Sequence, residues 1–131
     1  MKNKDLVSQW MSRVKGNIAY AKVGKISDDI FYEDLCFNIQ QAVEKALKAL
    51  LIGMDIEYPF THSIGQLINL IEKQGLVVPD KILETSYLTE YAVETRYPDA
   101  YRSLNERDYL EGLELAQKAV AWVEKELEKL P

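Results

Sequence analysis

Cysteine and histidine each occur only once among the 131 residues, as Cys36 and His62. One cysteine excludes an intramolecular disulfide and a cysteine-based zinc site, and one histidine leaves no histidine pair for a zincin-type metal site. The chain also holds only 6 glycines and 4 prolines, too few for a fold of short strands and tight turns. We therefore expect no disulfide and no metal site.

Long hydrophobic runs are absent as well. The longest unbroken apolar run extends from Ala49 to Met54, far short of the about 20 residues that span a bilayer. The N-terminus has lysine and polar residues in place of the apolar core of a signal peptide. Because hydrophobic residues still make up 47% of the composition, a sizeable core can form, and we expect one cytoplasmic domain over residues 1–131.

Negative charge prevails, but it is distributed unevenly. The net charge is -5, from 16 basic and 21 acidic residues. The first 25 residues contain six of the basic residues and only one acid, so the remainder carries a net charge of -10. The basic residues of this segment are Lys2, Lys4, Arg13, Lys15, Lys22 and Lys25. They form either the solvated face of a first helix or a basic strip that meets phosphates or an acidic partner.

The spacing of apolar residues is helical almost throughout and predicts five helices. Three are long, over residues 3–24, 29–54 and 106–129, and two are shorter, from residue 61 or 63 to 75 and from 79 to 91. Residues 95–104 lack this period and are predicted to form a loop. The predicted fold is an all-α, antiparallel four- to five-helix up-and-down bundle, which forms a homodimer through surplus apolar surface on the second and last helices.

Local signals support the ends of two of these helices. Asp28 and Asp29 are predicted as the N-cap and a first-turn acid of the second helix. Asn105 and Asp108 have the spacing of a capping box before the last helix. In the fourth helix, the 3.6-residue period predicts three inward-facing side chains, those of Ile82, Leu83 and Tyr87.

Five polar residues of the second helix fall within one wedge of about 140°. They are Gln40, Gln41, Glu44, Lys45 and Lys48. Apolar residues occupy the other side, as is usual for a helix at the surface of a bundle. We interpret the wedge as a solvent-exposed face on which Glu44 and Lys48 form a routine i,i+4 ion pair worth about 0.2–0.5 kcal/mol.

His62 lies just before or within the first turn of the third helix. Because the ordinary pKa of histidine is near neutral, this side chain can carry a proton in catalysis, or it can serve as a structural hydrogen-bonding group. Cys36 lies within the second helix and is predicted to be a small core residue.

The predicted loop combines arginine with tyrosine. Its candidates for binding are Arg96, Tyr97, Tyr101 and Arg102, with Arg107 just beyond. Guanidinium groups bind phosphate oxygens in pairs, and tyrosine rings stack on bases. The nearby carboxylates of Asp99, Glu106 and Asp108 allow the alternative that ion pairs only pin the loop.

The run from Cys36 to Leu51 resembles the signature helix of the HEPN (higher eukaryotes and prokaryotes nucleotide-binding) family. The Thr61-His62 pair, the segment Glu94–Ala100 and the terminal helix follow in the family's order, so the resemblance covers residues 3–128. It implies a compact helical bundle, a homodimer and a small nucleotidyltransferase encoded nearby. Many such pairs are toxin–antitoxin systems in which the HEPN protein is an RNase.

The RNase members of the family carry an arginine followed, after four to six residues, by a histidine. Neither Arg96 nor Arg102 has a histidine in that window, and the one histidine, His62, precedes both. Tyrosine and arginine, which occupy the windows, are poor general bases at neutral pH. The family's nuclease mechanism is therefore not expected here.

What the resemblance implies instead is nucleotide or RNA binding, with ATP as a candidate ligand and no resident cofactor. The expected binding residues are Arg96, Tyr97, Arg102, His62, Lys48 and Tyr91. Arg96 would hold a phosphate, a tyrosine would contact a base, and His62 and Lys48 would line the same cleft. One alternative is a non-enzymatic interaction module that shields or positions the nucleotidyltransferase. Another is an RNase whose site is split between His62 and Arg96.

Overall fold

The computed structural model describes residues 1–92 and 103–131, and all regular structure in these two ranges is helical. The elements are α1 (Lys4–Lys22), α2 (Tyr32–Gly53), α3 (Ile64–Lys73), α4 (Asp80–Leu83), the 3₁₀ helix η1 (Glu84–Ala92) and α5 (Glu106–Glu128). The predicted all-α bundle is confirmed. Within the described ranges, none of the helices has the length and apolar character needed to cross a membrane.

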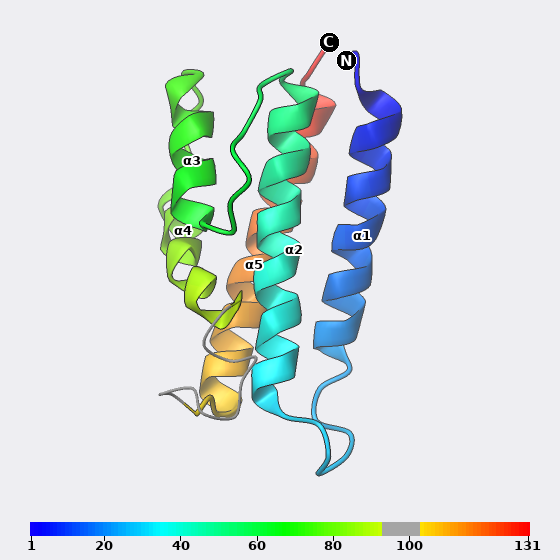
Figure 1. The fold of residues 1–131 in the computed structure, drawn as a ribbon, viewed down its shortest axis with the longest axis vertical. Helices are drawn as coiled ribbons and strands as arrows, with labels where there is room; N and C mark the ends of the chain where they lie inside the picture. Colours follow the sequence, from blue (N-terminus) through cyan, green and yellow to red (C-terminus); the bar gives the residue numbers. More distant parts are fainter. Residues whose placement is uncertain (93–102) are drawn as a thin grey trace.

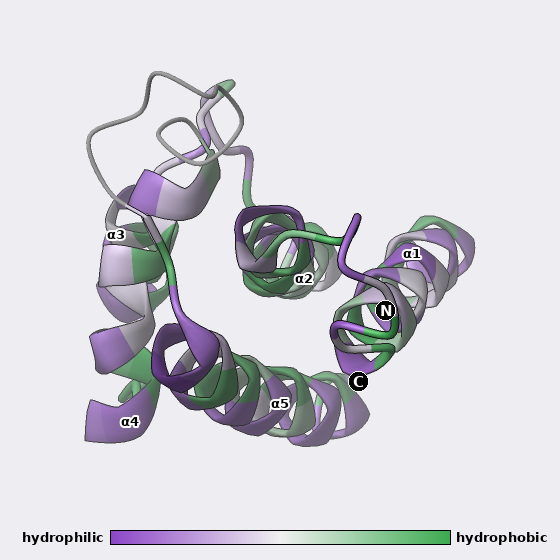
Figure 2. Ribbon diagram, turned by 90° about the horizontal axis from the view of Figure 1, so that it is seen from below, coloured by the Kyte–Doolittle hydropathy of each residue, from purple (hydrophilic) through white to green (hydrophobic). Residues whose placement is uncertain are grey.

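The long helices α1, α2 and α5 lie alongside one another, and α3, α4 and η1 cover the remaining side (Figure 1). Seen from the end of the bundle, the hydrophobic residues face the space that the helices enclose (Figure 2). α1 runs antiparallel to α2, whereas α3 and α5 run in the same direction as α2. Strict up-and-down alternation is interrupted at α3 because residues 54–63, the return segment, leave the end of α2 and pass back along it.

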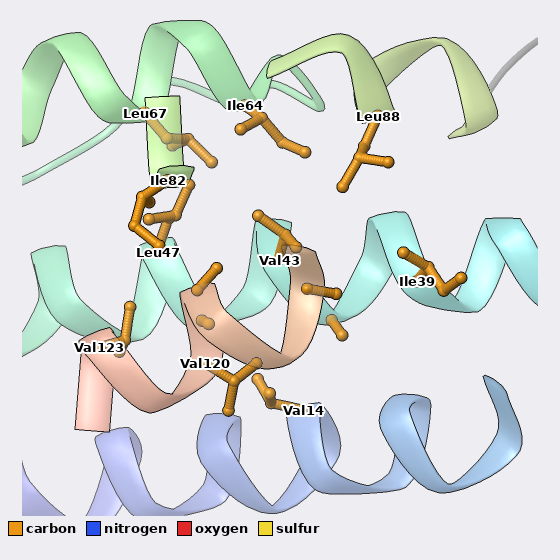
Figure 3. Close-up of a cluster of buried hydrophobic side chains, with 14 of the residues drawn as sticks. Val14, Ile39, Val43, Leu47, Ile64, Leu67, Ile82, Leu88, Val120 and Val123 are labelled. Atoms are coloured by element: carbon orange, nitrogen blue, oxygen red, sulfur yellow. The ribbon is translucent and has the colours of Figure 1, made fainter. Parts of the chain in front are cut away.

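The core lies around α2, and side chains from every other helix contribute to it. Figure 3 shows Ile39, Val43 and Leu47 of α2 among side chains from the neighbouring helices. The buried apolar residues of α2 extend from Leu35 to Leu51. The prediction that α2 has surplus apolar surface for a dimer interface is therefore wrong, because contacts within one chain cover its apolar residues. The homodimer itself stays a prediction.

Large exposed hydrophobic side chains lie mostly outside α2 and α5. In the described residues, they include Tyr20, Val23, Ile26, Phe31, Phe60 and Val77, and on α5 only Leu110. Cys36 is buried in the core, as its sequence context predicts.

The start of α2 differs from its prediction. Phe31, not Asp28, occupies the N-cap position, and it makes no side-chain cap hydrogen bond. The residues before it form a local turn, in which the Ile30 amide donates to the Ser27 carbonyl at 3.1 Å. Asp28 and Asp29 lie in this turn, outside the helix. Glu33 and Asp34 therefore supply the first-turn negative charges that interact favourably with the positive end of the helix dipole.

The predicted capping box of α5 is confirmed. The side chain of Asn105 accepts from the Asp108 amide at 2.9 Å, and the Asp108 carboxylate accepts from the Asn105 amide at 3.1 Å. At α3, the Ser63 hydroxyl accepts from the Gln66 amide. The helix ends before Gly75, which has a φ of 90°. Glycine adopts this left-handed conformation at little cost.

The fourth predicted helix is mostly 3₁₀ helix, which changes the face that it buries. The buried side chains recur every three residues, at Ile82, Thr85 and Leu88 and again at Tyr91. Of the three inward residues predicted, only Ile82 is buried, because the 3.6-residue period does not apply to a helix with three residues per turn. Leu83 and Tyr87 are each 36% exposed.

Candidate functional site

The return segment begins with a sharp reversal at the end of α2. Asp55 has a φ of 60°, the left-handed conformation. The Ile56 amide donates to the Leu51 carbonyl and the Asp55 amide to the Ile52 carbonyl, at 2.9 and 3.0 Å. This is the Schellman pattern, with aspartate in the position that glycine usually takes. It directs residues 56–63 back along α2 (Figure 1).

The return segment lies over the polar wedge of α2. Gln40, Glu44 and Lys48 are 0%, 3% and 6% exposed, so the prediction of a solvent-exposed face is wrong for these three residues. The error has a physical cause: helical period shows which residues share a face, but it does not show that a distant segment covers that face. Gln41 and Lys45, at the edge of the wedge, are half-buried.

Glu44 is the centre of a hydrogen-bonded group of side chains, which we call the Glu44 cluster. Its Oε1 accepts from Gln40 Nε2 at 2.9 Å and lies 2.9 Å from His62 Nδ1. Its Oε2 accepts from Lys48 Nζ, also at 2.9 Å. Gln40 in turn accepts from Gln41 Nε2 at 2.7 Å. The contact between Glu44 and His62 links α2 to the return segment.

These contacts keep the buried carboxylate charged. Burial raises the pKa of Glu44, but the hydrogen bonds from Gln40, Lys48 and His62, together with the charge of Lys48, outweigh burial and lower the pKa below its ordinary value. A carboxylate that accepts several hydrogen bonds is stabilised in its ionised form. The cluster therefore holds a fixed negative charge inside a mostly apolar bundle.

His62 connects this buried charge to the surface. Its side chain is 57% exposed, while that of Glu44 is 4% exposed. With Nδ1–H donating to the carboxylate, the tautomer that this contact favours leaves Nε2 as a proton acceptor. Phe60, which is 97% exposed, lies edge-on to the imidazole, with 5.9 Å between ring centroids. A carboxylate-held imidazole of this kind can bind a phosphate when protonated or accept a proton when neutral.

Lys48 is held from two sides. Its ammonium pairs with Glu44 and lies 5.5 Å from the centroid of the Tyr58 ring. Burial, and then the charge of Glu44, raise the pKa of Tyr58. The structure thus brings Lys48 and His62 together on one carboxylate. Since the ammonium of Lys48 is already paired and almost fully buried, it positions Glu44 and is poorly placed to hold a ligand itself.

Of the other predicted site residues, only Tyr91 lies in the described structure, and it lies apart from the Glu44 cluster. Tyr91 is 2% exposed and packs edge-on against Tyr87, at a separate cleft of about 450 Å³ between η1 and α5. Arg96, Tyr97, Tyr101 and Arg102 lie outside the described residues, as does the segment Glu94–Ala100. Arg107 is exposed and pairs at 2.9 Å with Glu111 of its own helix, α5, so this pair does not test whether ion pairs pin the loop.

Sequence reasoning missed Gln40, Gln41 and Tyr58 as partners in the cluster. A signal existed: Gln40, Glu44 and Lys48 recur every four residues in a helix whose other residues from Leu35 to Leu51 are mostly apolar. In the described part of the chain, no three histidine, cysteine, aspartate or glutamate side chains are grouped so that they could hold a metal ion.

Comparison with known proteins gives one family and two similar structures. The model of the HEPN domain family matches residues 7–127. The crystal structure of an archaeal HEPN homologue is 30% identical and covers 92% of this chain and 97% of its own, with a TM-score of 0.73. A crystal structure of a protein from Thermus thermophilus is 29% identical, covers 96% and 99%, and has a TM-score of 0.79. No curated protein matches the chain.

Proposed function

Because the chain belongs to the HEPN domain family, we propose that it is a nucleotide- or RNA-binding protein that works with a small nucleotidyltransferase in a toxin–antitoxin-like pair. The observation that carries the binding proposal is the half-exposed imidazole of His62, held 2.9 Å from the buried carboxylate of Glu44. A fixed imidazole can contact a phosphate or a ribose hydroxyl without first losing side-chain freedom.

In this proposal, Arg96 and Arg102 hold phosphate oxygens and Tyr97 contacts a base. His62 contacts the same ligand, and Lys48 acts indirectly by keeping Glu44 ionised. Phe60, edge-on to His62 and almost fully exposed, offers a further ring surface at this place. We leave Tyr91 out of the binding site because it is buried at the separate cleft between η1 and α5.

Calorimetric titration with ATP and with a short single-stranded RNA tests the proposal. We expect binding of at least one of these ligands by the unmodified protein, and about tenfold weaker binding by His62→Ala and by Arg96→Ala. Arg107→Ala is the matched control for the arginine change, since its guanidinium already pairs with Glu111. Undiminished binding by both Arg96→Ala and His62→Ala would contradict the assignment.

The interaction-module alternative makes a different prediction. Residues 26–131 carry a net charge of -10, which suits a basic protein partner and repels free RNA. If the module is correct, the protein co-purifies with the nucleotidyltransferase encoded beside it but binds neither ATP nor RNA. Co-expression of the pair, followed by the same titrations on the complex and on the isolated protein, separates the two functions.

The Glu44–His62 pair also favours a second candidate, an RNase with a split site. A carboxylate that orients an imidazole is an arrangement that supports general-base catalysis. In such a site, His62 would accept the proton of the attacking 2′-hydroxyl and Arg96 would stabilise the phosphate. The missing arginine–histidine motif leads us to expect binding without cleavage, and an RNA cleavage assay decides between them.

A further inference from the structure

Basic side chains differ in their partners between the two halves of the molecule. Lys81, Arg107, Lys118 and Lys129 each pair with a glutamate three or four residues away on the same stretch of helix. Arg13 of α1 and Lys45 of α2 have no carboxylate within ion-pair distance among the described residues. Positive charge on the seam between these two helices is therefore not neutralised locally.

Lys45 is fixed in place by a chain of amides. Asn38 donates to the Asp34 carbonyl at 3.2 Å, Asn17 donates to Asn38 Oδ1 at 2.9 Å, and Lys45 Nζ donates to Asn17 Oδ1 at 2.9 Å. The side chain of a typical surface lysine is free to rotate. The Lys45 side chain instead crosses the seam to Asn17, which is itself held by Asn38. An ammonium has three N–H groups, so two remain for another acceptor.

Arg13 lies on the same side of the seam. α1 and α2 run antiparallel (Figure 1) and lie side by side in both views (Figures 1 and 2). Arg13 precedes Asn17 by one helical turn and lies about 40° from it around the α1 axis. In an antiparallel pair, a residue one turn nearer the N-terminus of α1 is level with a residue one turn nearer the C-terminus of α2. Arg13 is therefore level with residues of α2 that follow those facing Asn17. Helical geometry thus puts Arg13, an exposed residue, at the level of Lys45 along the seam.

The charges of this region repel one another. Burial and then the positive charge of Arg13 lower the pKa of Lys45, and Lys48 adds to the effect while Glu44 opposes it. Glu44 offsets only part of this repulsion, because the charge of its carboxylate is already paired with Lys48. A negatively charged ligand between Arg13 and Lys45 would remove this repulsion.

We propose that Arg13 and Lys45 form an oxyanion site on the seam between α1 and α2, and that the site binds a phosphate group. The planar guanidinium can donate two parallel hydrogen bonds to phosphate oxygens, and the fixed ammonium supplies a third contact. The site requires neither a base nor a ribose, so it extends beyond the proposed site at His62. The phosphate can come from a mononucleotide or from an RNA backbone.

Inorganic tripolyphosphate is the probe for the shared chemistry, since it carries no base and no sugar. Its binding is followed by NMR through the side-chain amides of Asn17 and Asn38, which belong to the chain that holds Lys45. We expect Arg13→Gln and Lys45→Met each to weaken binding about tenfold. Lys15→Met is the matched control: Lys15 is exposed, like Arg13, and its replacement removes one charge from the same helix, but it lies about 160° around the axis from Arg13.

Several outcomes of this test are decisive. Loss of binding in both variants but not in Lys15→Met supports the site. Competition experiments then identify where the bound phosphate comes from. Displacement of tripolyphosphate by ATP indicates a mononucleotide site, and displacement by single-stranded RNA indicates a site for the RNA backbone. Absence of tripolyphosphate binding, or an equal loss in Lys15→Met, overturns the site. Because the probe is not a nucleotide, this result is independent of the ATP and RNA titrations that test His62 and Arg96.

Discussion

Replacing Glu44 by glutamine tests whether the Glu44 cluster stabilises the fold through charge. The substitution keeps the size of the side chain and one acceptor oxygen, but it removes the negative charge. Lys48, with a side chain that is 8% exposed, then loses its counter-ion, and His62 loses the carboxylate that holds Nδ1. The cluster is also the direct link between α2 and the return segment, so the substitution weakens that contact.

The expected cost follows from this burial. Removing one partner of a buried ion pair costs about 3–5 kcal/mol, because the other charge stays buried without a partner. Glutamine still offers an acceptor to Lys48, and the Tyr58 ring still lies beneath the ammonium. We therefore expect the free energy of unfolding to fall by about 2–3 kcal/mol at pH 7. This is a large fraction of the about 5–15 kcal/mol that stabilises an ordinary domain.

The assay is urea unfolding followed by circular dichroism, repeated as a function of pH. The folded-state pKa of Glu44 lies below its ordinary value of 4.5. The carboxylate therefore contributes its full stabilisation above the unfolded-state pKa, and this contribution is lost as the pH falls through the folded-state pKa. Hence the difference between the unmodified protein and Glu44→Gln is largest near neutral pH and narrows below about pH 4.5.

Glu114→Gln is the matched control. Glu114 and Lys118 form an ion pair with the same i,i+4 spacing, at 3.0 Å, but both side chains are exposed. Water and salt screen such a pair, so we expect no measurable change in stability. Equal effects of Glu44→Gln and Glu114→Gln, or a difference that does not narrow in acid, would refute the role assigned to burial.

Three further predictions concern backbone, capping and catalysis. Asp55→Gly is expected to raise the free energy of unfolding by about 0.5–1 kcal/mol, because glycine adopts a φ of 60° with less strain; a lower urea midpoint would contradict this. Asn105→Ala is expected to lower it by about 1 kcal/mol by removing the capping box of α5, and an unchanged midpoint would show that the cap contributes nothing. The isolated protein is expected not to cleave tRNA or unstructured RNA above background without added metal. Cleavage that is abolished in His62→Ala or Arg96→Ala would instead establish the split RNase site.

The sequence by itself determined most of the helical framework, because helix formation depends on local signals. The apolar spacing in α1 and α5 predicted these helices to within about two residues at each end. The capping box of Asn105 and Asp108 was readable because its two partners are three residues apart. Core membership of Cys36 followed in the same way from its place on an apolar helix.

Local signals were insufficient where two helical periods competed. Residues 84–92 form a 3₁₀ helix, which the spacing of apolar residues alone did not distinguish from an α-helix. Leu88 and Tyr91 are buried because they pack in the bundle with Ile82 at a period of three. Asp28 and Asp29 were likewise assigned to the start of α2, although they lie in a turn at Ser27–Ile30, outside the helix.

Only the tertiary structure decided the environment of the polar wedge on α2. Glu44 and Lys48 have the spacing of a surface ion pair, and Glu114 and Lys118 with the same spacing do form one. The difference between the two pairs is the return segment, which the reversal at Asp55 directs over Glu44 and which brings His62 to it from 18 residues away. Periodicity records which residues share a face of one helix, whereas burial depends on what other segments cover that face, and this is a property of the whole chain.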